Sequence, residues 1–257
     1  MSTYETFLTL HRQDQPLLIG NVWDLTSAKA FEESGYKAIA TSSVAVANSF
    51  GYEDKQHIPF QLLLDTVKTI TKHIVIPLSV DMEAGYNDTV PGILENIEKI
   101  HDVGAVGFNI EDSVITEKGK MRTIEDFQHS VSSIRNHLDR KNMKMFINTR
   151  TDAYVHKLDS RLTETINRAK AYEQAGSSGI FVPFLDEEND AREIVKATTL
   201  PVSLFYTPTL PLFEEVGSWG IKRISMGGSI YRSMINSLKS TLQSIRQDQS
   251  FRSLGKK

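Results

Sequence analysis

The sequence contains no cysteine, which excludes disulfide bonds, thiolate metal sites and a cysteine nucleophile. It also lacks an apolar run long enough to cross a bilayer, and residues 1–10 lack the charged and then apolar profile of a signal peptide. Basic residues (29) and acidic residues (32) nearly balance, so no positive charge excess points to nucleic acid. We therefore expect a soluble, cytoplasmic protein with no nucleic-acid partner and no membrane partner.

A glycine-rich phosphate loop is missing too, and this absence bears on the fold. Strand-like and helix-like segments alternate along the 257 residues and form eight strand–helix units. This count is typical of a (β/α)8 TIM barrel, an α/β fold that we expect to form a single domain over residues 1–257. The alternative, a doubly wound open sheet, usually has glycines after its first strand. Here residues 17–22 are followed by Trp-Asp-Leu-Thr, which favours the barrel.

The expected elements follow from apolar periodicity and from glycine at helix ends. The expected strands cover residues 17–22, 38–43, 74–83, 105–111, 145–152, 179–183, 200–206 and 221–226. The expected helices cover residues 26–34, 60–73, 90–103, 124–138, 161–175, 187–197, 210–219 and 229–245. The polar and basic tail after residue 247 is expected to be loosely held.

Two carboxylates lie close together at the end of the third expected strand. Side chains alternate along a strand, so Asp81 and Glu83 are expected on one face and Val80 and Met82 on the other. Their mutual repulsion favours a divalent cation between them. Because the histidines show no paired ligand spacing, zinc is disfavoured, and Mg²⁺ is favoured with Mn²⁺ possible.

The next two strands also end in polar residues. Asn109 and Glu111 share one face of the fourth strand, and Asn148, Arg150 and Asp152 share one face of the fifth. In a TIM barrel such residues lie at the carboxyl ends of neighbouring strands, where active sites form. Each of them alone is better explained as structural, for example as a helix cap or an ion-pair partner. Several inward-facing acids at one barrel mouth, however, indicate a cation site.

Five motifs with their spacing resemble the phosphoenolpyruvate mutase/isocitrate lyase superfamily, from residue 21 to about residue 242. They are Asn21-Val22-Trp23-Asp24, Ser42-Ser43 with Gly51-x-x-Asp54, Asp81-x-Glu83-x-Gly85-Tyr86, Asn109-Ile110-Glu111-Asp112 and Asn148-x-Arg150-x-Asp152. The resemblance implies a small-molecule 2-oxo acid substrate held by Mg²⁺. It also implies a last helix exchanged with a neighbouring subunit, and therefore a homodimer or homotetramer.

The resemblance further assigns roles to individual residues. Asp81 would bind the metal directly, and Asp54, Glu83 and Glu111 would reach it mainly through water. Arg150 would stabilise the enolate oxygen. The implied catalytic residues are Arg150, Glu111 and Asp54, and the implied substrate-binding residues are Trp23, Ser42, Ser43, Asp81, Asn148, Arg150 and Ser203.

Departures from the superfamily pattern reduce the number of reactions that this chain is expected to catalyse. The lyase branch carries a cysteine-containing segment after strand four, whereas this chain has residues 113–122 there, without cysteine. The lysine–asparagine pattern of the mutase branch is also missing. The leading hypothesis is therefore a Mg²⁺-dependent lyase or decarboxylase that acts on a small 2-oxo acid through a pyruvate-enolate-like intermediate. One alternative is a phosphonopyruvate-type phosphonomutase or hydrolase, and a second is a non-catalytic 2-oxo acid binding protein.

Overall fold

The computed structural model describes residues 2–114 and 120–255. Within these residues, parallel strands form one sheet in the order β1-β9-β8-β7-β6-β5-β4-β3-β2. The strands are β1 (Leu17–Leu18), β2 (Gly20–Val22), β3 (Ile39–Thr41), β4 (Leu78–Asp81), β5 (Gly107–Glu111), β6 (Phe146–Arg150), β7 (Gly179–Phe181), β8 (Val202–Phe205) and β9 (Arg223–Ser225). The predicted α/β TIM-barrel fold is thereby confirmed.

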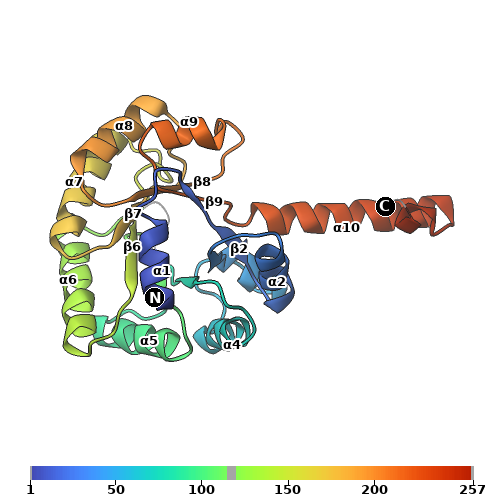
Figure 1. Ribbon diagram of the computed structural model, residues 1–257, viewed down its shortest axis with the longest axis horizontal. Coiled ribbons are helices and arrows are strands. Elements are labelled where there is room, and N and C mark those ends of the chain that lie inside the picture. Colours follow the sequence, from blue (N-terminus) through green and yellow to red (C-terminus); the bar gives the residue numbers. More distant parts are fainter. Residues whose placement is uncertain (1, 115–119, 256–257) are drawn as a thin grey trace.

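Helices surround this barrel (Figure 1). They are α1 (Thr3–Leu10), α2 (Leu25–Glu33), α3 (Ser43–Ser49), α4 (Phe60–Thr71), α5 (Val90–Asp102), α6 (Ile124–Arg140), α7 (Arg161–Gln174), α8 (Glu188–Ala197), α9 (Phe213–Ser218), α10 (Ser229–Asp248) and the 3₁₀ helix η1 (Arg252–Gly255). None of the helices in the described part of the chain is long and apolar enough to span a membrane.

The barrel closes at its first strand, which is split into β1 and β2. β1 pairs with β9, and β2 pairs with β3. At the junction, the Ile19 N–H donates to the Ile224 carbonyl (2.9 Å), while the Gly20 N–H donates to the Ala38 carbonyl (3.3 Å). One continuous predicted strand therefore changes partner between two residues, and this change joins the two edges of the sheet.

The surrounding helices hold the strands through apolar stripes at helical spacing. On α5 the buried residues include Ile93, Ile97 and Ile100, and on α6 they include Phe127 and Val131. Each fully buried side chain of this size stabilises the fold by about 1.5–3 kcal/mol. The resulting core fixes the strand register, and with it the positions of the polar residues at the carboxyl ends of the strands.

Two α-helices of the described residues, α1 and α3, were not predicted, and neither was the short 3₁₀ helix η1. α1 has a capping box between Ser2 and Glu5 and buries Phe7 and Leu10 in a cluster that includes Phe146 at the start of β6. It therefore covers the amino-terminal end of the barrel (Figure 1). α3 lies directly after β3, where a loop was expected, and places its first residues beside the candidate site.

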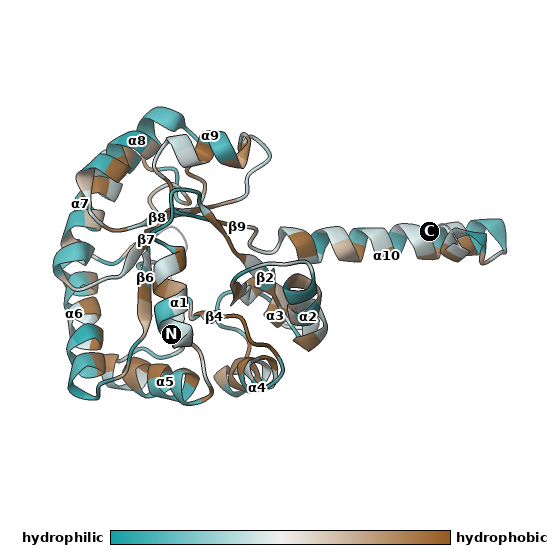
Figure 2. Ribbon diagram, in the orientation of Figure 1, coloured by the Kyte–Doolittle hydropathy of each residue, from teal (hydrophilic) through white to brown (hydrophobic). Residues whose placement is uncertain are grey.

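The last long helix, α10, differs from all the others in its packing. It extends away from the barrel, and none of its 20 residues is buried. Figure 2 shows apolar residues recurring along its length. Exchange of this helix between subunits stays a prediction, as does the single-domain assignment.

Candidate active site

Asp81 is the last residue of β4 and lies at the carboxyl end of the barrel. Its N–H donates to Thr41 Oγ1 (2.8 Å), and its Oδ2 accepts a long hydrogen bond from the Ser43 N–H (3.4 Å). Its other oxygen, Oδ1, is buried and has no hydrogen-bond partner among the described residues. A buried carboxylate oxygen without a partner is costly, which indicates a position for a cation.

Asp54, in the loop before α4, presents a second oxygen of this kind. Its Oδ1 is also buried without a hydrogen-bond partner among residues 2–114 and 120–255. Burial and the neighbouring Asp81 carboxylate raise the pKa of Asp54 above its usual range. Two neighbouring acids, each with an unpartnered buried oxygen, form an environment that a divalent cation would stabilise.

Glu83 was expected on the same strand face as Asp81, and that part of the prediction is wrong. β4 ends at Asp81, and Glu83 lies in the following turn with φ of 48°. Its carboxylate nevertheless lies near the other acids: it accepts from the Gln56 N–H (3.1 Å to each oxygen) and from the Tyr86 hydroxyl (2.9 Å). Burial, followed by the charges of Asp81 and Asp54, raises the pKa of Glu83 to about 8.

Backbone strain is concentrated around this carboxylate. Lys55, Gln56, Glu83 and Tyr86 all have positive φ, between 48° and 75°. The two strained turns hold each other, because the Gln56 N–H binds Glu83 and the Gln56 side-chain oxygen accepts from the Tyr86 N–H. Residues in this region cost about 1–3 kcal/mol each and are typical of functional sites.

Arg150, the last residue of β6, lies beside Glu111, the last residue of β5. Its guanidinium contacts Glu111 (2.9 Å) and makes a two-pronged interaction with Asp152 (2.6 and 3.1 Å). Burial alone would lower the pKa of Arg150, but Glu111 and Asp152 raise it, so this side chain stays charged. Burial raises the pKa of Glu111, and the Arg150 charge only partly offsets that effect.

A buried hydrogen-bond network around Asp112 holds Asp152, the partner of Arg150, in place. Asp112 Oδ1 accepts from the Asp152 N–H (3.1 Å), and Asp112 Oδ2 accepts from Arg168 (3.0 Å) and from the Tyr172 hydroxyl (2.7 Å). Asp112 is fully buried, and both of its carboxylate oxygens accept hydrogen bonds. The network therefore fixes the position of Asp152, and through it the orientation of Arg150.

The remaining predicted residues lie around the same end of the barrel. Ser42 is buried and precedes α3. Trp23 follows β2 and packs edge-on against Tyr231 of α10 (5.1 Å between ring centroids). Asn148 donates to Asn109 (2.8 Å), and both its own Oδ1 and the hydroxyl of Ser203 are buried without partners among the described residues.

The carboxylates fit a cation that is held partly through water. Within residues 2–114 and 120–255, no three histidine, cysteine, aspartate or glutamate side chains are arranged to hold a metal ion by themselves. The unpartnered oxygen of Asp81 fits one direct ligand, and the carboxylates of Asp54, Glu83 and Glu111 lie close enough for the Asp81 charge to raise their pKa values. An all-oxygen donor set with several waters is the preference of Mg²⁺.

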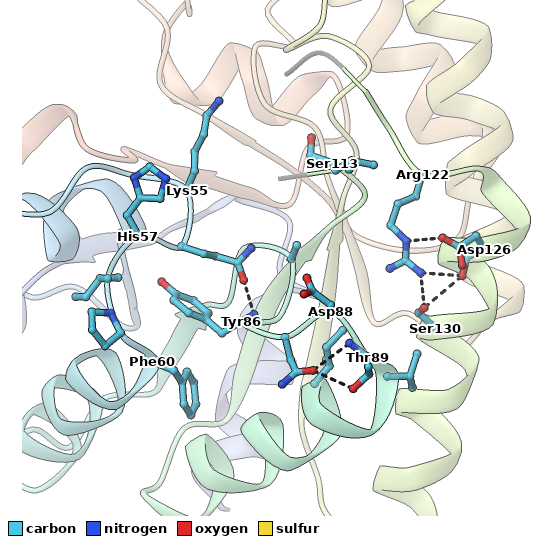
Figure 3. Close-up of a pocket in the computed structure, with 18 residues that line it drawn as sticks. Lys55, His57, Phe60, Tyr86, Asp88, Thr89, Ser113, Arg122, Asp126 and Ser130 are labelled. Carbon is cyan, nitrogen blue, oxygen red and sulfur yellow. Dashed lines mark hydrogen bonds and ion pairs between the residues drawn. The ribbon is translucent and has the colours of Figure 1, made fainter. Parts of the chain in front are cut away.

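A cavity of about 1000 Å³ opens next to Gln56 and Tyr86, which hold Glu83, although the predicted site residues themselves are not among the described residues that line it. Figure 3 shows it between the loop that carries Lys55 and His57, the turn at Tyr86, and the segment that carries Ser113 and Arg122. Its walls come from three successive strand-to-helix connections, so it lies at the carboxyl end of the barrel, where a substrate would enter.

A family model, described as phosphoenolpyruvate phosphomutase, matches residues 7–246. The chain belongs to this family. The match spans every strand of the barrel and confirms the superfamily assignment made from the five motifs.

Curated relatives and solved structures in the superfamily have several activities. The chain is 28% identical to 2-methylisocitrate lyase of Escherichia coli strain K12, covering 92% of this chain and 82% of the relative. It is 27% identical to oxaloacetate decarboxylase of Bradyrhizobium sp. strain BTAi1, covering 79% and 69%. A crystal structure provisionally described as a phosphonomutase, from Burkholderia cenocepacia J2315, is 32% identical, covers 94% of this chain and 99% of its own, and has a TM-score of 0.89.

A phosphonopyruvate hydrolase crystallised with oxalate and Mg²⁺ has a TM-score of 0.87 at 18% identity, covering 98% of this chain and 89% of its own. At that identity, the likeness concerns the fold alone. Members of this superfamily thus include lyases, decarboxylases, mutases and hydrolases, and this chain shares their barrel.

Sequence reasoning missed several residues at the site. Gln56 and Tyr86 hold Glu83, and Ser113 and His156 lie beside Asp152. Only Tyr86 was part of a motif. The others lie in loops, where residue type and spacing do not indicate that a residue belongs to the site before the fold is known.

Proposed function

We propose that this protein is a Mg²⁺-dependent lyase or decarboxylase that cleaves a small 2-oxo acid next to its keto group, through an enolate of the pyruvate type. The observation that supports it most strongly is the pair of unpartnered carboxylate oxygens on Asp81 and Asp54, with the charged Arg150 nearby. Curated relatives named as 2-methylisocitrate lyase and oxaloacetate decarboxylase support the same chemistry.

Each residue has a defined part in this proposal. A divalent cation next to Asp81 would polarise the keto oxygen as a Lewis acid. The hydroxyls of Ser42 and Ser43 and the Ser43 N–H would bind the substrate carboxylate, since the Ser42 N–H already donates to the Val22 carbonyl (3.0 Å). Arg150 would stabilise the negative charge that develops on the former keto oxygen, and Glu111 and Asp152 hold its guanidinium in place. Groups aimed at such a charge typically contribute about 100- to 1,000-fold to the rate.

Two other functions remain as alternatives. Similarity to the Burkholderia phosphonomutase-like structure at 32% identity supports a phosphonopyruvate-type mutase or hydrolase on the same site. A non-catalytic 2-oxo acid binding protein would keep the metal site and lose turnover. The large neighbouring cavity would admit either type of ligand.

Turnover of a small panel separates these functions. Oxaloacetate, 2-methylisocitrate and phosphonopyruvate would each be supplied with Mg²⁺, and pyruvate, glyoxylate and phosphate release would be followed. We expect pyruvate from a 2-oxo dicarboxylate, above the spontaneous rate measured with Mg²⁺ and no enzyme. Phosphate release or rearrangement of phosphonopyruvate alone would support the first alternative. Binding of these compounds without any turnover would support the second.

Assembly and location belong to the proposal as well. We propose a homodimer or homotetramer in which α10 packs on a neighbouring subunit, since this helix buries no residue on its own barrel. Cytoplasmic location stays a prediction, which cell fractionation would check.

A further inference from the structure

A hydrogen-bonded chain links the candidate site to a histidine that the proposed reaction has not used. The Ser113 hydroxyl donates to Asp152 Oδ2 (2.5 Å), and the same hydroxyl oxygen lies 3.2 Å from His156 Nε2. A serine hydroxyl has one proton, which here goes to Asp152. The Ser113 oxygen must then accept from His156, which places a proton on Nε2.

Ser113 lies directly beside the group assigned to the enolate. Asp152 Oδ2 accepts both from Ser113 Oγ and from Arg150 Nη2 (3.1 Å), so one shared oxygen separates the hydroxyl from the guanidinium. Ser113 also lines the cavity in Figure 3. The relay below requires its hydroxyl to turn from Asp152 toward a ligand that Arg150 holds.

The backbone keeps this serine in place. Ser113 forms an antiparallel bridge with Met121, and the neighbouring Arg122 N–H donates to the Asp112 carbonyl (2.8 Å). Ser113 is buried, whereas His156 is half-buried. This arrangement suits a path with its inner end at the substrate and its outer end at bulk water.

We propose that Ser113 and His156 form the proton relay that converts the enolate to product. The inference rests on the proposed function. It names the proton donor for the enolate, which in this chain cannot be a cysteine. Cleavage of the bond between C3 and its substituent leaves the electron pair in the enolate. The C2=C3 electrons then take the Ser113 hydroxyl proton and form a C3–H bond, and the C2 carbonyl is restored. Ser113 Oγ regains a proton from protonated His156, and His156 regains one from solvent.

The alternative is a purely structural role, in which Ser113 only orients Asp152. It predicts that Ser113 and His156 variants affect every step equally. The relay predicts instead that they affect proton transfer at C3 more than bond cleavage, since only the former requires the donor.

Exchange of the pyruvate methyl protons in D₂O tests the relay, because it requires proton transfer at C3 and no bond cleavage. Exchange would be followed by proton NMR with Mg²⁺, after subtraction of the rate without enzyme. We expect Ser113→Ala and His156→Asn to slow exchange by about 100-fold or more, the usual size of general acid–base catalysis. Added imidazole should restore part of the rate in His156→Ala. The matched control is His101→Asn, a half-buried histidine at the far end of α5, which should keep the wild-type rate.

Oxaloacetate consumption, measured in parallel, reports the proposed function separately. If wild-type protein consumes oxaloacetate and both variants exchange at the wild-type rate, the relay is wrong and the lyase proposal stands. Equal losses in both assays, with no imidazole rescue, would also overturn the relay in favour of a structural role. Wild-type protein that neither consumes oxaloacetate nor exchanges pyruvate protons would overturn both.

Discussion

At Asp81, one carboxylate oxygen accepts from the backbone, and the other is buried without a hydrogen-bond partner among the described residues. We expect Asp81→Ala to abolish Mg²⁺ binding, because it removes the proposed direct ligand. Glu83→Ala should weaken binding less, because Glu83 already accepts three hydrogen bonds and would reach the metal through water. Isothermal calorimetry would measure both. Undiminished Mg²⁺ affinity in Asp81→Ala would show that the site is assigned wrongly.

Glu83 gives the metal-free protein a specific pH dependence. Its pKa is about 8 in the folded state and near 4.5 when unfolded. Between these values the folded state binds more protons, so the free energy of unfolding falls as pH rises and then levels off above about 8. Thermal unfolding in EDTA between pH 5 and 8.5 should show this fall, and Mg²⁺ should reverse it. Glu83→Gln cannot titrate and should make the slope shallower, leaving the part that comes from the raised pKa values of Glu111 and Asp54. An unchanged slope would assign it to these other groups.

Arg150 distinguishes an electrostatic role from a structural one. Arg150→Lys keeps the positive charge and loses the planar, two-pronged contact with Asp152. If Arg150 stabilises the enolate, kcat should fall by about 100-fold or more while KM changes much less. Steady-state kinetics on the best substrate of the panel would measure this. Recovery of nearly the wild-type kcat at saturating Mg²⁺ would mean that Arg150 only braces Glu111.

Sequence patterns predicted the site residues on strands better than the site residues on loops. Glu111 ends its strand as predicted, whereas Asp81 and Arg150 end theirs two residues before the predicted ends at 83 and 152. Glu83 was placed on the strand, although the turn with Gly85 ends β4 two residues earlier: Gly85 has φ of 106°, and a Cβ there would lie 2.7 Å from Ile93. The hydrogen bonds from Gln56 and Ser113 depend on tertiary contacts that no local pattern encodes.

At the scale of elements, the helices with strong apolar stripes were predicted to within a few residues. α4 was expected over residues 60–73 and spans Phe60–Thr71, and α6 was expected over 124–138 and spans Ile124–Arg140. α1 was missed even though its capping box, Ser2 with Glu5, is readable in the sequence. α3 is rich in serine and alanine and follows a strand directly, so its sequence resembles a loop.

α10 offers the clearest test at this scale. Ile230, Met234, Leu238 and Leu242 recur every four residues and are 41–55% exposed, which is a large apolar stripe for a helix that buries none of its residues in the described part of the chain. We expect Leu238→Glu combined with Leu242→Glu to dissociate a homo-oligomer, because two charges would be buried in the interface.

Light scattering on a sizing column would measure the mass. The matched control combines Asn236→Glu with Gln243→Glu, which adds the same charge to the opposite, polar face of α10 and should leave the oligomer intact. A wild-type monomer at micromolar concentration would contradict the exchanged arrangement.

For the whole molecule, the barrel was predictable because eight strand–helix units and the missing phosphate loop leave few other folds. The split of the first strand into β1 and β2 was not predictable, since it arises when the barrel closes and one segment pairs with both edges. The site follows from the same closure, which brings the ends of β3 to β6 together and crowds their carboxylates.

Oxalate binding tests the central claim, that this barrel holds a planar enolate beside a divalent cation. Oxalate has the flat, doubly charged shape of the pyruvate enolate, and its affinity does not depend on which substituent leaves. Calorimetry with Mg²⁺ should show oxalate binding at least about 100-fold tighter than pyruvate, as expected of an analogue of the reactive state. The binding should disappear in EDTA and in Asp81→Ala. Oxalate that binds no tighter than pyruvate, or equally well without a divalent cation, would contradict the account.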